Sequence, residues 1–180
     1  CVLLAVNAIL RDRRPTLMLS GVNAGGNMGE DVTYSGTVAA AMEATQLGVP
    51  SIAMSQHNSD GHPLAWTTAA AYAPRVIKRL TALAWPRHTL INVNFPDVPP
   101  EKVVGVVATA QGRRKIGDHL VKRIDPRGRP YYWIGPMREE EKAAPGTDIR
   151  AVSEGKVVLT PICLDFTDRA ALAALKRALA

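Results

Sequence analysis

Two short apolar segments that enclose one helix-length segment constrain this chain most strongly. Residues 16–19 and 49–55 have the length and apolar character of buried strands. Between them, residues 37–47 are rich in alanine and end at Gly48, a residue typical of a helix C-terminus. Two strands joined by one helix form a βαβ unit, which requires a parallel sheet and a right-handed crossover. The sequence therefore predicts an α/β fold.

A glycine- and asparagine-rich segment, residues 20–38, connects the first predicted strand to the helix. Ligands of open α/β sheets bind at the carboxyl ends of the strands, and the free N–H groups of a helix start suit a phosphate. The spacing matches neither a Walker A loop nor a dinucleotide fingerprint. The residues alone leave two interpretations open: a phosphate site, or a structural loop in which Ser35 or Thr37 caps the helix.

The rest of the chain divides into an α/β part and a β-rich part. We expect residues 1–10 to be the end of a buried helix and residues 64–85 to be a helix kinked or divided at Pro74, with Val76, Leu80 and Leu83 in the core. The remaining predicted elements are strands at 89–96, 103–110, 129–134 and 156–162 and an amphipathic helix at 168–180. We therefore predict a core domain at 1–100 and an extension at 101–180.

Composition indicates a single domain of 180 residues, because 47% of the residues are hydrophobic and the net charge is only +6. No apolar run reaches the ~18 residues that span a bilayer, and no signal peptide is visible. Two cysteines without a framework favour reduced thiols. We therefore expect a cytoplasmic protein that does not contact a membrane.

The positive charge is concentrated in residues 111–130, which hold seven basic and two acidic residues. Such a basic arm indicates either a polyanionic or acidic partner or a solvated hairpin. The adjacent aromatic residues Tyr131, Tyr132 and Trp133 could stack on nucleic acid bases or pack in a hairpin between subunits. We favour the second interpretation, and nucleic acid is not an expected partner.

Several motifs together resemble the SurE family, the survival-protein-E nucleotidases. They are Ser20-Gly21-Val22-Asn23-Ala24-Gly25, Tyr34-Ser35-Gly36-Thr37-Val38, Ile91-Asn92-Val93-Asn94-Phe95-Pro96, Asp125-Pro126-Arg127-Gly128 and Gly146-Thr147-Asp148. The resemblance implies a Rossmann-like, mostly parallel sheet with helices on both faces and a β-rich C-terminal extension carrying a hairpin arm. It further implies a phosphomonoesterase of nucleoside 5′- and 3′-monophosphates that uses Mg²⁺ or Mn²⁺. Its expected assembly is a homodimer or homotetramer with exchanged C-terminal arms.

The resemblance also assigns roles to single residues. Asn23 is expected to be a metal ligand, and Asn27, Ser35 and Thr37 are expected to be catalytic. The expected phosphate-binding residues are Gly25, Asn27, Ser35, Gly36 and Thr37. The family's Asp-Asp metal pair does not occur in these 180 residues, so the resemblance places it before residue 1. One amide oxygen cannot hold a hard cation by itself.

Other polar residues allow more than one interpretation. Asp31 and Glu43 are better explained as structural than as ligands. His57 and His62 lie in a polar loop that could border the substrate. Asn92 and Asn94 could face a cleft or bond neighbouring strands, and the sequence does not choose. The alternative function is a non-catalytic nucleotide- or RNA-binding protein that uses the same loop and the basic arm.

Overall fold

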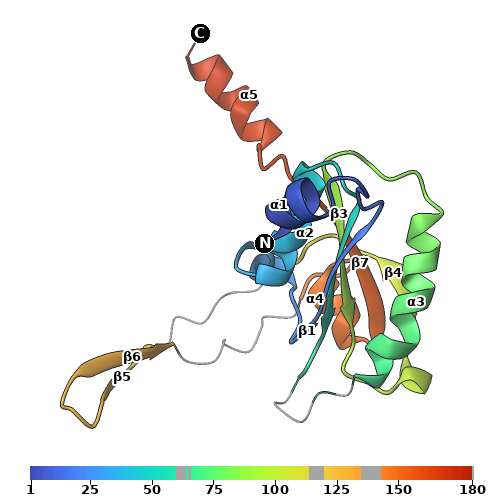
Figure 1. The fold of residues 1–180 in the computed structure, drawn as a ribbon. Helices are drawn as coiled ribbons and strands as arrows, with labels where there is room; N and C mark the ends of the chain where they lie inside the picture. Colours follow the sequence, from blue (N-terminus) through green and yellow to red (C-terminus); the bar gives the residue numbers. More distant parts are fainter. Residues whose placement is uncertain (60–63, 65, 114–119, 135–142, 180) are drawn as a thin grey trace.

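A five-stranded mixed sheet forms the centre of the computed structural model, which describes residues 1–59, 64, 66–113, 120–134 and 143–179 (Figure 1). The strand order is β1-β2-β3-β7-β4. The first three strands are parallel to one another, β7 is antiparallel to β3, and β4 is parallel to β7. The strands are β1 (Met18–Ala24), β2 (Ser51–Gln56), β3 (Thr89–Phe95), β4 (Gly105–Ala108) and β7 (Lys156–Cys163).

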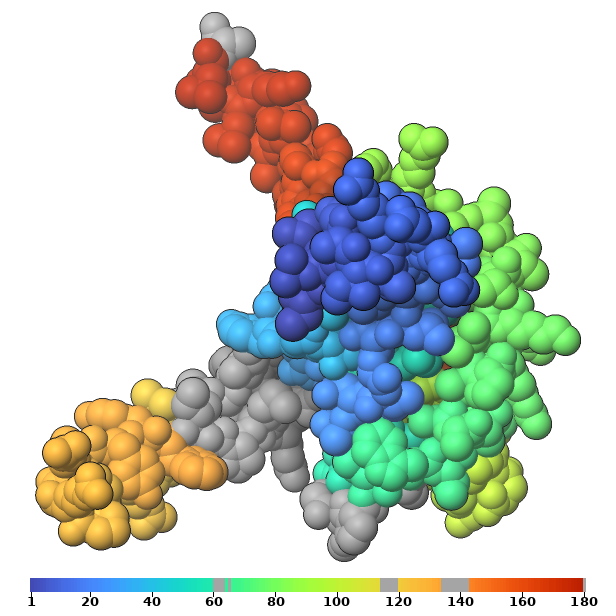
Figure 2. All heavy atoms as spheres, in the orientation of Figure 1, coloured from blue at the N-terminus to red at the C-terminus, as the bar shows by residue number. Residues whose placement is uncertain are grey.

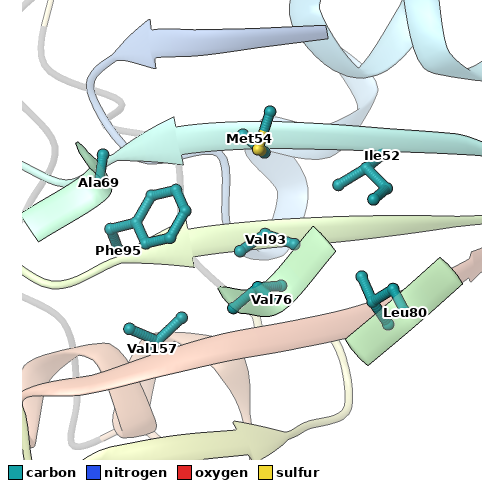
Figure 3. Close-up of a cluster of buried hydrophobic side chains, with 8 residues drawn as sticks. All are labelled: Ile52, Met54, Ala69, Val76, Leu80, Val93, Phe95 and Val157. Atoms are coloured by element: carbon teal, nitrogen blue, oxygen red, sulfur yellow. The ribbon is translucent and has the colours of Figure 1, made fainter. Parts of the chain in front are cut away.

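Helices cover both faces of this sheet. On one face, α3 (Thr67–Thr81) packs Val76 and Leu80 against side chains of β2, β3 and β7, among them the fully buried Phe95 (Figure 3). On the other face lie α2 (Gly36–Gln46) and the short α4 (Asp148–Ser153). Alternate residues of each strand therefore face different helices, as period-two geometry requires. The predicted mostly parallel sheet with helices on both faces is confirmed.

The hairpin of β5 (Leu120–Ile124) and β6 (Pro130–Ile134) forms a second, two-stranded sheet. This hairpin and α5 (Arg169–Ala178) both project from the body of the molecule (Figures 1 and 2). None of the described residues of α5 is buried. The predicted hairpin arm is thus present, whereas β4 and β7, which also belong to residues 101–180, join the central sheet.

The N-terminal segment differs from the prediction. Residues 1–10 are helical, as α1 (Val2–Leu4) followed by a π-helix (Ala5–Ile9), but only Val6 is buried. The prediction that this segment is helical is therefore correct, whereas the prediction that it is buried is wrong. The segment is apolar at nearly every position, whereas it contacts the rest of the chain, chiefly α2, along one side.

Several elements begin or end at other residues than the sequence predicted. Strand β1 continues through Ala24, so the first part of the predicted loop pairs with β2. Pro74 lies inside α3, which is not divided there, and Leu83 is exposed beyond its end.

Two 3₁₀ helices, η2 (Gly29–Thr33) and η3 (Pro100–Lys102), complete the described elements. No helix within the described ranges has the length and apolar character needed to cross a membrane.

Candidate active site at the carboxyl ends of β1 and β2

A polar cavity of about 400 Å³ lies where β1 and β2 end and α2 begins. Its walls come from the segment after β1, from the start of α2 and from the segment after β2. The lining residues are Gly25, Gly26, Asn27, Asp31, Tyr34, Ser35, His57 and Asn58. This is the position at which open α/β sheets bind their ligands.

The N-terminus of α2 supplies hydrogen-bond donors beside this cavity. Ser35 is the N-cap, and its Oγ accepts a hydrogen bond from the backbone N–H of Val38 at 3.1 Å. The N–H groups of Gly36 and Thr37 have no partner among the described residues, as expected for the first turn of a helix. A side chain built on Gly36 would meet nothing within 4 Å, so the backbone is open to a ligand there.

Two side chains of β3 form hydrogen bonds with the backbone of Asn27. Its backbone N–H donates to Oδ1 of Asn94 at 2.8 Å. Its carbonyl oxygen accepts from Nδ2 of Asn92 at 2.7 Å and from Nδ2 of Asn94 at 3.1 Å. Both β3 asparagines are fully buried. The question that the sequence left open is thereby answered: these two residues bind the loop that lines the cavity.

The side chain of Asn27 is bonded within the site as well. Nδ2 donates to Oγ of Ser55, on β2, at 2.6 Å. An amide NH₂ carries two hydrogens, so this bond leaves one donor for a ligand. Gly26, the preceding residue, is closely surrounded by side chains, because an added Cβ would lie 3.1 Å from Nδ1 of His57 and 3.0 Å from Cε of Met28. A larger residue at this position would therefore push against His57, which lines the cavity as Gly26 does.

Asn23, the expected metal ligand, lies near the end of β1, and it does not line the cavity. Its Nδ2 donates to the carbonyl oxygen of Gly25 at 2.9 Å, and no donor among the described residues is bonded to its Oδ1. That oxygen suits a hard cation. However, the described part of the chain contains no group of three His, Cys, Asp or Glu side chains that could hold a metal ion. The described residues thus offer one ligand and do not complete a metal site.

The cavity includes residues that the sequence did not single out. Of the expected phosphate residues, Gly25, Asn27 and Ser35 line it, whereas Gly36 and Thr37 lie next to it in the first turn of α2. Tyr34 and Asn58 line it without having been predicted. Tyr34 could have been found from the sequence, because it directly precedes Ser35, the expected helix cap. Nothing in the sequence pointed to Asn58.

Two residues judged structural or peripheral also border the cavity. Asp31 lines it and accepts a long bond, 3.4 Å, from the N–H of Met28, so it also closes the loop. His57 lines it from the segment after β2. Glu43 lies in α2 and is not part of the lining. His62, together with Arg114 and Lys115 of the basic arm, lies outside the described residues.

A second cavity of similar volume, about 400 Å³, lies at the opposite ends of β2 and β3. Residues 45, 46, 48–50 and 85–89 line it, and within this lining Trp85 donates from Nε1 to the carbonyl oxygen of Thr89 at 2.9 Å. It lies at the amino ends of the strands, where α/β folds do not place their ligands. The cavity beside α2 is therefore the better candidate for an active site.

The family model described as survival protein SurE matches residues 1–118. The chain belongs to the SurE family. A relative from Paramagnetospirillum magneticum, named 5′-nucleotidase SurE, is 55% identical over 98% of this chain and 68% of its own length. A relative of the same name from Rhodospirillum rubrum is 51% identical over 97% of this chain and 68% of its own length.

A solved structure supports the same conclusion for the fold. The crystal structure of the SurE protein from Aquifex aeolicus matches with a TM-score of 0.83 at 38% identity. The match covers 100% of this chain and 72% of that one. The SurE resemblance stated from the motifs is confirmed.

Proposed function

We propose that this SurE-family protein hydrolyses nucleoside 5′-monophosphates, and 3′-monophosphates as well, to nucleoside and inorganic phosphate. The observation that carries the proposal is the open first turn of α2, where the N–H groups of Gly36 and Thr37 adjoin a polar cavity. A helix N-terminus with free N–H groups favours a phosphate. The name 5′-nucleotidase, which the two bacterial relatives carry, supports the same reaction.

The chain's own residues would bind and orient the phosphoryl group. The N–H groups of Gly36 and Thr37 and the second hydrogen of Asn27 Nδ2 would donate to its oxygens. These donors are fixed in advance by the helix and by the bond from Asn27 to Ser55. They would offset the charge of the phosphoryl oxygens while a water oxygen forms a bond to phosphorus and the ester P–O bond breaks. The water loses a proton, and the leaving nucleoside oxygen gains one.

We also propose that Mg²⁺ or Mn²⁺ takes part, with Oδ1 of Asn23 as one ligand. When bound, such an ion polarises phosphoryl oxygens and acidifies bound water. Because the described residues do not complete a metal site, the roles given above to Gly36, Thr37 and Asn27 are those of hydrogen-bond donors only.

Tyr34 is a candidate for contact with the base. This residue is 78% exposed and lines the cavity, so its ring can offer a stacking face to any base. We expect Tyr34→Ala to raise KM for adenosine 5′-monophosphate while leaving KM for glycerol 2-phosphate, which has no base, unchanged. An equal change for both substrates would contradict this role.

The function is tested with full-length protein by measuring phosphate release from adenosine 5′- and 3′-monophosphate with Mn²⁺ and with EDTA. We expect metal-dependent turnover, its loss in Asn23→Ala with an unchanged melting temperature, and normal turnover in Asn7→Ala, an exposed asparagine of the N-terminal segment. Turnover that persists in EDTA would refute the proposed dependence on a metal ion. Nucleotide binding without turnover would favour the non-catalytic alternative.

We further propose a homodimer or homotetramer that exchanges C-terminal arms. The exposed apolar side chains of the arms support this, since Leu175 is 59% exposed on α5 and Trp133 is 64% exposed on β6. Light scattering should give an oligomer mass that Leu175→Glu lowers and Lys176→Glu does not. A monomeric wild type would refute the proposal.

A further inference from the structure

Gly29 lies two residues after Asn27, and both of its backbone polar groups form hydrogen bonds with distant parts of the chain. It begins η2 with a φ of +53°, a conformation that favours glycine. Its N–H donates to Oδ2 of Asp148 at 3.0 Å, and its carbonyl oxygen accepts from Nε2 of Gln111 at 2.7 Å. The loop is therefore fixed at Asn27 by β3 and at Gly29 by a different part of the fold.

Asp148 is a fully buried carboxylate at the start of α4. Its Oδ1 accepts from the N–H of Gly112 at 2.7 Å and from the N–H of Ile149 at 2.8 Å, while Oδ2 bonds Gly29. A buried carboxylate without donors is strongly unfavourable, and three backbone donors satisfy this one. The single side chain thus joins α4, residue 112 and the loop of the cavity.

Apolar packing reinforces this junction. Met28, between Asn27 and Gly29, is 2% exposed and belongs to one buried cluster with Ile149 and Val152 of α4. Gly112 is also tightly enclosed, since an added Cβ would lie 2.8 Å from Oδ1 of Asp148. The contact between α4 and the loop therefore has little freedom to shift without breaking the bonds to Gly29.

We propose that Asp148 and Gln111 are positioning residues of the phosphate site, which set the place of Asn27 and Ser35 through Gly29. The proposal rests on the phosphate-binding function proposed above. Asn27 and Ser35 lie on either side of η2 and both line the cavity, so we expect a shift of Gly29 to be transmitted along the backbone to both, against the bonds by which β3 holds Asn27. Misplacement of binding groups by ~1 Å can lower the rate about a hundredfold.

Asp148→Asn isolates the bond to Gly29. The amide of the variant has one oxygen, and placing it at Oδ1 preserves the bonds to Gly112 and Ile149. The NH₂ group then faces the N–H of Gly29, so two donors meet and only that bond is lost. Gln111→Leu removes the other bond to Gly29 at an exposed residue, which makes unfolding of that variant a smaller risk than at the buried Asp148.

Asp168→Asn is the matched control for the loss of one carboxylate. Asp168 caps α5, away from the cavity, and its Oδ1 alone accepts from the N–H groups of Ala170 and Ala171, both at 2.9 Å. The asparagine of this variant preserves both bonds. The substitution and the charge change equal those of Asp148→Asn, whereas the position differs.

The measurements are kcat and KM for adenosine 5′-monophosphate, the affinity for inorganic phosphate by calorimetry, and the melting temperature, all on full-length protein. We expect Asp148→Asn to weaken phosphate binding and raise KM by about tenfold or more at a temperature where the variant is folded. Gln111→Leu should act in the same direction, and the double variant should show less than the sum of the two effects, because both act through Gly29. Asp168→Asn should match the wild type.

A lowered melting temperature of Asp148→Asn with unchanged KM and phosphate affinity would overturn the proposal, since Asp148 would then be structural only. Independent, additive effects of the two substitutions would also contradict a shared action through Gly29. Phosphate binding by a wild type that does not hydrolyse nucleotides would refute the proposed function, yet the affinities would still test Asp148. A wild type that binds no phosphate would overturn both.

Discussion

The two buried asparagines of β3 should differ sharply in what they contribute to stability. Asn94 makes two hydrogen bonds to the backbone of Asn27, one to its N–H and one to its carbonyl oxygen. Asn92 makes one bond to the same carbonyl oxygen, and its own Oδ1 is buried without a partner among the described residues. Leucine has a similar branched shape and no polar atoms, so it is the informative substitution at both positions.

The magnitudes follow from the bonds that each variant breaks. Asn94→Leu removes two bonds of about 1 kcal/mol each and leaves the buried N–H of Asn27 unpaired, so we expect a loss of about 3 kcal/mol. Asn92→Leu removes one bond of about 1 kcal/mol. The carbonyl oxygen of Asn27 keeps its bond from Asn94, and an unpaired buried oxygen disappears, so we expect almost no net loss.

Thermal and urea unfolding of both variants, followed by circular dichroism, measures this difference. For a protein of this length, a difference of about 3 kcal/mol corresponds to a difference in Tm of roughly 6–12 °C. Strain from fitting leucine into a fully buried site affects both variants and largely cancels in the comparison. Equal destabilisation of the two variants, or a greater loss in Asn92→Leu, would refute the reasoning.

Three further predictions concern the backbone, the cap and the core. Gly21→Ala should destabilise the fold by ~2 kcal/mol or more in urea unfolding, because φ is +116° and a Cβ would overlap the backbone carbonyl oxygen of Met54. An unfolding midpoint equal to that of the wild type would contradict this. Ser35→Ala should cost about 1 kcal/mol, whereas Ser35→Asp should keep the cap and weaken phosphate binding in calorimetry by charge repulsion; unchanged affinity would argue against a phosphate there. Phe95→Ala should cost roughly 3–5 kcal/mol of unfolding free energy in urea titrations, and a loss below 1 kcal/mol would contradict its place in the core.

The sequence predicted the βαβ unit because local patterns determine it. Apolar runs of strand length, an alanine-rich segment without breakers and Gly48 at its end are all properties of neighbouring residues. The period-two geometry of β3 puts Asn92 and Asn94 on the face opposite Val93 and Phe95, and this too depends only on neighbouring residues. What these two asparagines bind was not readable, because Asn27 is 67 residues from Asn94 in the chain.

The burial of the N-terminal segment likewise depends on contacts that the sequence does not reveal. The apolar residues 1–10 fit a buried helix in isolation, yet Leu4 is 63% exposed and Ile9 is 79% exposed. Hydrophobic pattern indicates which side chains favour burial, whereas the neighbouring elements decide how much surface is covered. In this structure only the side of Val6 meets α2 and the segment before β2.

The sequence by itself thus determined the α/β fold, the family and the segment that carries the candidate site, since each depends on residues close together in the chain. The tertiary structure alone decided how that segment is held. Asn92 and Asn94 bind it at Asn27, while Gln111 and Asp148 bind it at Gly29. The physical reason is that a buried polar group must find a partner, and only the folded sheet brings partners so distant in the chain within hydrogen-bonding distance.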